Sequence, residues 1–86
     1  MYSVTYAAEL TKILARLPRN LVKRIIERIE DVAAGPYQGH PNVTKLKGRD
    51  GYRLRVGDWR VIYDLDDDSQ VMIVLVIGPR GQVYKK

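Results

Sequence analysis

Hydrophobic and polar residues alternate most regularly between Tyr52 and Tyr63, and this alternation predicts a β-hairpin. The apolar and aromatic face of the hairpin carries Tyr52, Leu54, Val56, Trp59, Val61 and Tyr63. Gly57-Asp58 suits a two-residue turn, because Gly accepts positive φ at the first central position. In that register Arg55 lies directly opposite Arg60, with Arg53 beside them on the other face.

Like charges placed opposite each other in a sheet destabilise it by a few tenths of a kcal/mol, roughly, when they are solvated. A chain tolerates this cost when the charged face meets an anion. We therefore interpret the arginine face as an anion-binding surface, and a merely solvated basic face is the alternative.

The segments before the hairpin carry different periodicities. Tyr2 to Tyr6 alternates as a short strand, and the apolar spacing over Ala7 to Leu17 predicts a helix. Pro18 is expected to open a second helix, where its missing N–H is not needed. That helix has one apolar stripe and is expected to stop at Gly35-Pro36.

The remaining segments complete an α+β fold. Val43 to Leu46 is predicted as a strand, and the continuously apolar run Val71 to Ile77 as a central strand buried on both faces. We expect a single domain over residues 1–86. It would have an N-terminal strand, an antiparallel helical hairpin, and then a curved antiparallel sheet of three to four strands. The helices would cover one face, and the open face would present the arginines, with Arg80 at a strand end.

Charge is concentrated in one part of this basic chain. The net charge is +5, and Lys45 to Arg60 contains six Lys or Arg against two Asp. Four of the five net positive charges therefore fall on the hairpin and the segment before it. Such a local excess indicates a polyanionic partner, either nucleic acid or an acidic protein.

Several classes of site are disfavoured. The chain has no Cys, so it has neither a thiolate nucleophile nor a Cys-based metal site. His40 is interpreted as a solvated loop residue, and the acids between Asp64 and Asp68 as a solvated turn that lacks the pattern of a calcium loop. We expect no metal and no cofactor. No apolar run is long enough to span a bilayer and no signal segment is seen, so a soluble, cytoplasmic protein is expected.

Three motifs follow one another over the chain. They are the run Lys45-Leu46-Lys47-Gly48, the stretch Tyr52-Arg53-Leu54-Arg55 with Trp59-Arg60-Val61-Ile62-Tyr63, and the ending Arg80 with Val83-Tyr84. Together with the N-terminal strand and helical hairpin, they resemble the RelE/ParE superfamily of toxins from bacterial type II toxin–antitoxin modules. The resemblance covers essentially the whole chain, and it is closer to the RelE-like branch.

For that branch the resemblance implies ribosome-dependent cleavage of mRNA in the ribosomal A site. The family's basic strand residues fall on Arg53 and Arg55, its two further arginines on Arg60 and Arg80, and its C-terminal tyrosine on Tyr84. The catalytic set is then expected to be Arg60, Arg80, Tyr84 and Arg55, and the RNA-binding set Arg53, Lys45, Lys47 and Arg49.

The expected chemistry is metal-independent attack of the RNA 2′-OH on the adjacent phosphorus. Arg60 and Arg80 would clamp the scissile phosphate, and Tyr84 would orient a base or assist proton transfer. The best-known members place lysines where this chain has Arg53 and Arg55. Arginine stays protonated and is a poor general base, so the ribosome, the substrate or water would complete proton transfer.

Two alternatives remain open. One is a DNA gyrase inhibitor of the ParE type with the same fold, and the other is a non-catalytic RNA-binding module. The resemblance also implies a cognate acidic antitoxin as partner, besides the ribosome and mRNA. The toxin–antitoxin complex would bind operator DNA through the antitoxin, and no membrane would be involved.

Overall fold

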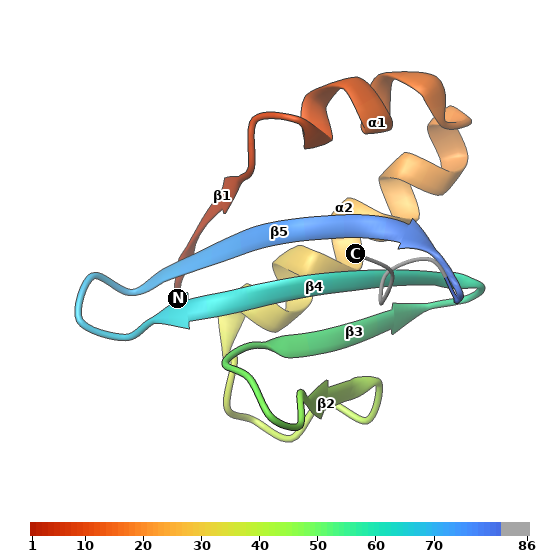
Figure 1. Ribbon diagram of the computed structural model, residues 1–86. Helices are drawn as coiled ribbons and strands as arrows, with labels where there is room; N and C mark the ends of the chain where they lie inside the picture. The colour runs from red at the N-terminus through yellow and green to blue at the C-terminus, as the bar shows by residue number, and fades with distance from the viewer. Residues whose placement is uncertain (82–86) are drawn as a thin grey trace.

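A computed structural model describes residues 1–81 of the chain (Figure 1). Its elements, in chain order, are β1 (Ser3–Tyr6), α1 (Leu10–Arg16), α2 (Arg19–Ala34), β2 (Val43–Lys45), β3 (Tyr52–Val56), β4 (Trp59–Asp66) and β5 (Val71–Pro79). The predicted α+β order of strand, two helices and then a run of strands is confirmed.

The strands form one five-stranded sheet in the order β1-β5-β4-β3-β2. The four strands that follow the helices pair antiparallel, as predicted. The first strand, β1, lies parallel to β5 at one edge, a pairing that the sequence did not indicate. In Figure 1, β1 and β2 therefore lie at opposite edges of the sheet, with α2 behind it.

The predicted hairpin and its register are confirmed. Val56 pairs with Trp59 across the turn, and Arg55 pairs with Arg60. Gly57 adopts φ 58°, the left-handed conformation that this tight turn requires.

The helices differ from their predicted bounds mainly at the start of α1. The apolar spacing suggested a helix from Ala7, but α1 begins at Leu10, because the Ala7 N–H, directly after β1, still donates to the Val74 carbonyl of β5 at 2.9 Å. The second helix begins directly after Pro18, whose carbonyl accepts the Val22 N–H at 3.0 Å, and Gly35 caps its C-terminal end.

None of the described helices is long and apolar enough to cross a membrane.

The core lies between the helices and one face of the sheet. Its buried side chains are Leu10, Ile25, Ile29, Val32, Ala33, Leu54, Val56, Val61, Tyr63, Met72, Val74 and Ile77. The helix α2 contacts β3 and β1, and α1 contacts β5, so both helices lie on the same side. Within residues 1–81, no element covers the opposite face, which is the open face of the sheet.

The prediction that β5 is buried on both faces was wrong. This strand does lie inside the sheet, between β1 and β4, but Leu75 is 38% exposed. The register shifts between Ile62 and Tyr63, which pair with Val76 and Val74, so Leu75 is an unpaired bulge residue. Ile73 and Val76 are also only partly buried, so the continuous apolar run does not reflect burial on both faces.

Asp67 of the acidic turn and His40 each make a hydrogen bond that the sequence did not predict. Asp67 accepts hydrogen bonds from the hydroxyls of Tyr2 at 2.8 Å and Tyr37 at 2.9 Å, and it thereby ties three distant segments together. These bonds raise the pKa of both tyrosines. His40 is half-buried, and its Nε2 lies 2.8 Å from the Gly35 carbonyl oxygen. Asp66, Asp67 and Asp68 are exposed, so the acidic turn is solvated as predicted, and Asp67 in addition bonds two tyrosines. The prediction that His40 is a solvated loop residue is corrected, because His40 is partly buried against the Gly35 carbonyl.

Tyr63 combines complete burial with an unsatisfied hydroxyl. Its exposed fraction is 0%, and its Oη has no hydrogen-bond partner in the described part of the chain. The ring stacks on Tyr52, with 5.4 Å between centroids and 18° between planes. Burial, with a smaller effect of Tyr52, raises the pKa of Tyr63.

We expect Tyr63→Phe to raise the free energy of unfolding by about 1 kcal/mol, because it removes a buried polar group that makes no bond. The raised pKa of Tyr63 contributes stability that is full below the ordinary tyrosine value of 10.0 and is lost as pH rises above it. Urea titrations between pH 7 and 11 should therefore show a smaller loss at high pH in the variant. Tyr37→Phe is the contrasting control, since it removes a hydrogen bond to Asp67 and should lower stability. A Tyr63→Phe variant that is clearly less stable than the wild type would contradict this account.

Candidate active site

Pairing across the sheet gathers arginines at one end of the open face. Arg55 lies opposite Arg60, and Arg60 lies opposite Gly78, which adds no side chain. The next row along the sheet on the same face places Arg53 opposite Ile62. The open face therefore presents cations toward the hairpin turn and an apolar residue further along.

These arginines line a cavity of about 330 Å³, which we call the arginine cavity. Its lining residues are Asn42, Thr44, Arg53, Arg55, Arg60, Arg80 and Gly81. Four guanidinium groups thus meet at one cavity, and none of its described lining residues is Asp, Glu or His.

The hairpin turn fixes two of the four arginines. Arg60 is half-buried, and its Nη1 donates to the carbonyls of Gly57 and Trp59, each at 3.0 Å. Arg80 follows the end of β5, and its backbone N–H donates to the Asp58 carbonyl at 2.8 Å. The turn therefore holds the guanidinium of Arg60 and the backbone of Arg80 at one end of the cavity.

The other two arginines come from β3. The Arg55 N–H donates to the Asn42 carbonyl at 2.9 Å, and its Nη2 lies 3.4 Å from the Asn42 side-chain oxygen. Arg53 is half-buried and pairs with Thr44 on β2. The short strand β2 and the residue before it thus form the second wall.

The arrangement suits an anion with several charged oxygens. A guanidinium presents paired N–H donors that match phosphate or carboxylate oxygens, and it stays charged at any physiological pH. Without a carboxylate or imidazole in the described lining, the cavity can stabilise negative charge, but its side chains cannot abstract a proton.

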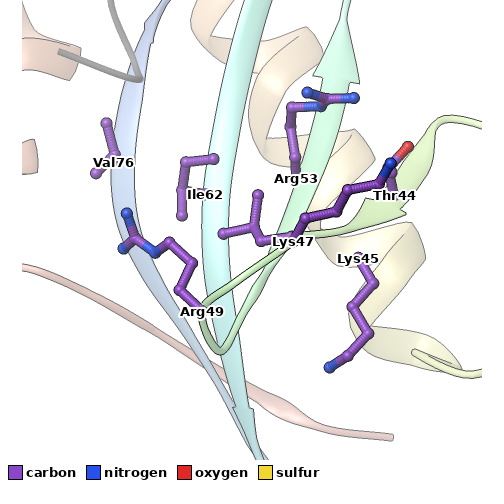
Figure 2. Close-up of a pocket in the computed structure, with 8 residues that line it drawn as sticks. Thr44, Lys45, Lys47, Arg49, Arg53, Ile62 and Val76 are labelled. Atoms are coloured by element: carbon purple, nitrogen blue, oxygen red, sulfur yellow. The ribbon is translucent and has the colours of Figure 1, made fainter.

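The four predicted RNA-binding residues line one cavity, which neighbours the arginine cavity. Lys47 and Arg49, on the loop between β2 and β3, line a neighbouring cavity of about 430 Å³ together with Arg53 (Figure 2). Lys45 borders that cavity, but its Nζ lies 4.9 Å from the ring centroid of Tyr52, on the helix-covered face. Lys45 thus lines the same cavity as Arg49 and Arg53, while its ammonium group lies over the Tyr52 ring. Tyr84 lies outside the described residues.

Asn42 and Thr44 were missed by reasoning from sequence. Asn42 lies in the loop before β2, and a polar residue in a loop gives no signal of its own. The alternation of Val43 with Thr44 could have placed Thr44 on the open face.

Elsewhere in the described chain, no group of three or more His, Cys, Asp or Glu side chains could hold a metal ion.

Comparison with known proteins gives consistent results. The profile of the family "ParE toxin of type II toxin-antitoxin system, parDE" matches residues 1–84. RelE1 of Methanocaldococcus jannaschii is 31% identical over 86 residues, which are 98% of this chain and 96% of that protein.

Solved structures agree in fold. The RelE chain of the archaeal RelE–RelB complex from Pyrococcus horikoshii OT3 superposes with a TM-score of 0.80 and is 33% identical, covering 94% of this chain and 97% of that one. The intact E. coli RelBE complex gives a TM-score of 0.79 at 20% identity, with 95% and 100% of the two chains covered, and this likeness concerns the fold alone.

The pairing of Arg55 with Arg60 should have a measurable cost in the unliganded protein. Arg55→Gln should raise the free energy of unfolding by a few tenths of a kcal/mol, roughly, because it relieves repulsion across the ladder. The gain should shrink as salt increases, since salt screens exposed charges. Urea titrations at low and high NaCl measure both effects. Lys23→Gln, an exposed site on α2, is the matched control and should change little. A gain that does not depend on salt would rule out repulsion as its cause.

Proposed function

The chain belongs to the RelE/ParE superfamily of toxins of type II toxin–antitoxin modules, and from this premise we propose that it is a ribosome-dependent mRNA endonuclease. It would cleave translated mRNA in the ribosomal A site and so inhibit translation. The observation that carries the proposal is the convergence of Arg53, Arg55, Arg60 and Arg80 on one cavity. Four charged donors around one concave site suit the negative charge that develops on a phosphate during cleavage.

The proposed reaction needs no metal. The 2′-oxygen of a ribose attacks the adjacent phosphorus while the bond to the 5′-oxygen of the next nucleotide breaks. The products are a 2′,3′-cyclic phosphate and a free 5′-hydroxyl, so no water is consumed in this step. Negative charge grows on the phosphate oxygens in the transition state, and positively charged donors placed there lower the barrier.

We assign roles from position in the cavity. Arg60 and Arg80 lie at the hairpin turn and would clamp the scissile phosphate. Arg55 and Arg53 lie along β3 and would hold the flanking phosphates and add positive potential. Such contacts also place the 2′-oxygen in line with the bond that breaks, which contributes to the rate independently of charge.

Proton transfer would depend on groups outside the described cavity. Its described lining residues offer no carboxylate or imidazole, so the 2′-OH proton would leave to the ribosome, to the substrate, to water or to Tyr84, and the departing 5′-oxygen would take up a proton from one of the same sources. A toxin of this design should act poorly on free RNA and well on ribosome-bound mRNA.

We further propose a cognate acidic antitoxin as the neutralising partner. The P. horikoshii RelE was crystallised with RelB, and the arginine cavity is a strongly positive target for an acidic protein. The toxin–antitoxin complex would bind operator DNA through the antitoxin, and the toxin would act in the cytoplasm.

The test is a cell-free translation reaction with end-mapped mRNA, run with and without ribosomes. We expect codon-phased cuts that require ribosomes. Arg60→Ala or Arg80→Ala should lower the cleavage rate by about 10²–10³-fold, because each removes a charged donor to the phosphate. Lys12→Ala, an exposed lysine on α1, is the control that should cut like the wild type.

Other outcomes identify the alternatives. The matching family profile is that of ParE toxins, so a folded protein that cuts no RNA should be assayed next against DNA gyrase. Salt-dependent RNA binding without any cleavage product would instead indicate a non-catalytic RNA-binding module.

A further inference from the structure

We propose that the cavity next to the arginine cavity is a subsite for one unstacked base of the RNA, belonging to a nucleotide adjacent to the scissile phosphate. The proposal rests on the proposed function in so far as RNA is the ligand. It adds a binding site that would give the toxin a base preference at one position. We call this cavity the base cavity; its lining residues are Thr44, Lys45, Leu46, Lys47, Arg49, Arg53, Ile62 and Val76.

The two cavities are continuous along the sheet. Thr44 and Arg53 line both of them. The strand pairing explains this, because Thr44, Arg53, Ile62 and Val76 form one row across β2, β3, β4 and β5. The row with Arg55 and Arg60 lies next to it on the same face. A single strand whose phosphate sits in the arginine cavity can therefore place its next nucleotide over the base cavity.

The chemistry of the base cavity matches a nucleotide. Its floor is apolar, formed by Ile62, which is 3% exposed, and by Val76 and Leu46. Its rim is cationic, and no carboxylate is among its described lining residues. A nucleotide has an apolar base face and charged phosphates on either side of it. The apolar floor of the cavity would therefore contact the base, and the cationic rim would contact the phosphates. The volume of about 430 Å³ suits a single small group.

The loop between β2 and β3 holds the rim in place. The Leu46 N–H donates to the Gly51 carbonyl at 3.0 Å, which closes the loop over the open face. Gly51 has φ 116°, and a Cβ there would lie 3.1 Å from the Tyr63 carbonyl oxygen, so the closure requires glycine. Figure 2 shows the Arg49 guanidinium beside Val76 and Ile62, and Lys47 extending toward Thr44.

An acidic peptide would also match the cationic rim. The observations favour RNA, because the cavity is continuous with the site where the phosphate is proposed to bind. A peptide helix would in addition need a longer apolar groove than three side chains provide.

The experiment measures the affinity of the full chain for single-stranded hexanucleotides by fluorescence anisotropy. The 2′-O-methyl backbone prevents cleavage, and each position in turn is made abasic. We expect removal of the base at one position to weaken binding about tenfold, and removal elsewhere to have little effect. Val76→Phe fills the cavity and should abolish this difference while leaving the affinity for the abasic strand unchanged. Lys12→Ala should behave like the wild type, and Lys47→Ala should weaken all strands alike.

Each outcome bears on the proposal. Equal losses at every abasic position in the wild type would overturn it without any variant, so a Val76→Phe protein that fails to fold leaves the test intact. A folded Val76→Phe protein that still discriminates would also overturn it. The cleavage assay on ribosomes is independent: phased cuts without base discrimination would refute the subsite alone, and discrimination without cuts would refute the nuclease alone.

Discussion

The register between β3 and β4 is the constraint on which the rest of this structure depends. It is set from two sides, by the two-residue turn at Gly57-Asp58 and by the core. Leu54, Val61 and Tyr63 are at most 2% exposed, and a slip of one residue would turn them to the open face. Burial of each of these side chains stabilises the fold by about 1.5–3 kcal/mol, and a slip of the register would lose that free energy. The repulsion between Arg55 and Arg60 is smaller and is therefore tolerated.

The arginine cavity follows from the same constraint at longer range. Pairing of β5 with β4 places Gly78 opposite Arg60, and the chain then leaves the sheet at Pro79. Arg80 is held there by its backbone bond to Asp58, in the turn of the hairpin. Residues far apart in the sequence thus meet because two strand registers are fixed by burial on the opposite face, and the hydrogen bonds of Arg60 to the Gly57 and Trp59 carbonyls then hold its guanidinium in place.

Features set by residues close together in the sequence could be predicted, whereas features set by contacts between distant segments could not. The hairpin, its turn and the grouping of Arg53, Arg55 and Arg60 follow from alternation within twelve residues, and they were predicted with the correct register. The bulge at Leu75 and the parallel pairing of β1 arise from contacts between distant segments, which no local pattern reports. Lys45 was grouped with the basic residues by charge and lines the base cavity with them, but the position of its ammonium over Tyr52 depends on a cross-strand contact that charge does not report.

Because all four basic residues in the described lining of the arginine cavity are arginines, they can supply positive charge but no general base. Guanidinium groups remain protonated throughout the physiological range, so their stabilisation of a phosphate transition state would not vary with pH. A lysine in the same place could lose its proton when buried and serve as a base. In a nuclease, the described part of this chain would supply charge and orientation, and the proton would have to move through another group. If the chain is a nuclease, its activity would depend on a partner that supplies that group, and the ribosome is one that is present wherever its substrate is translated.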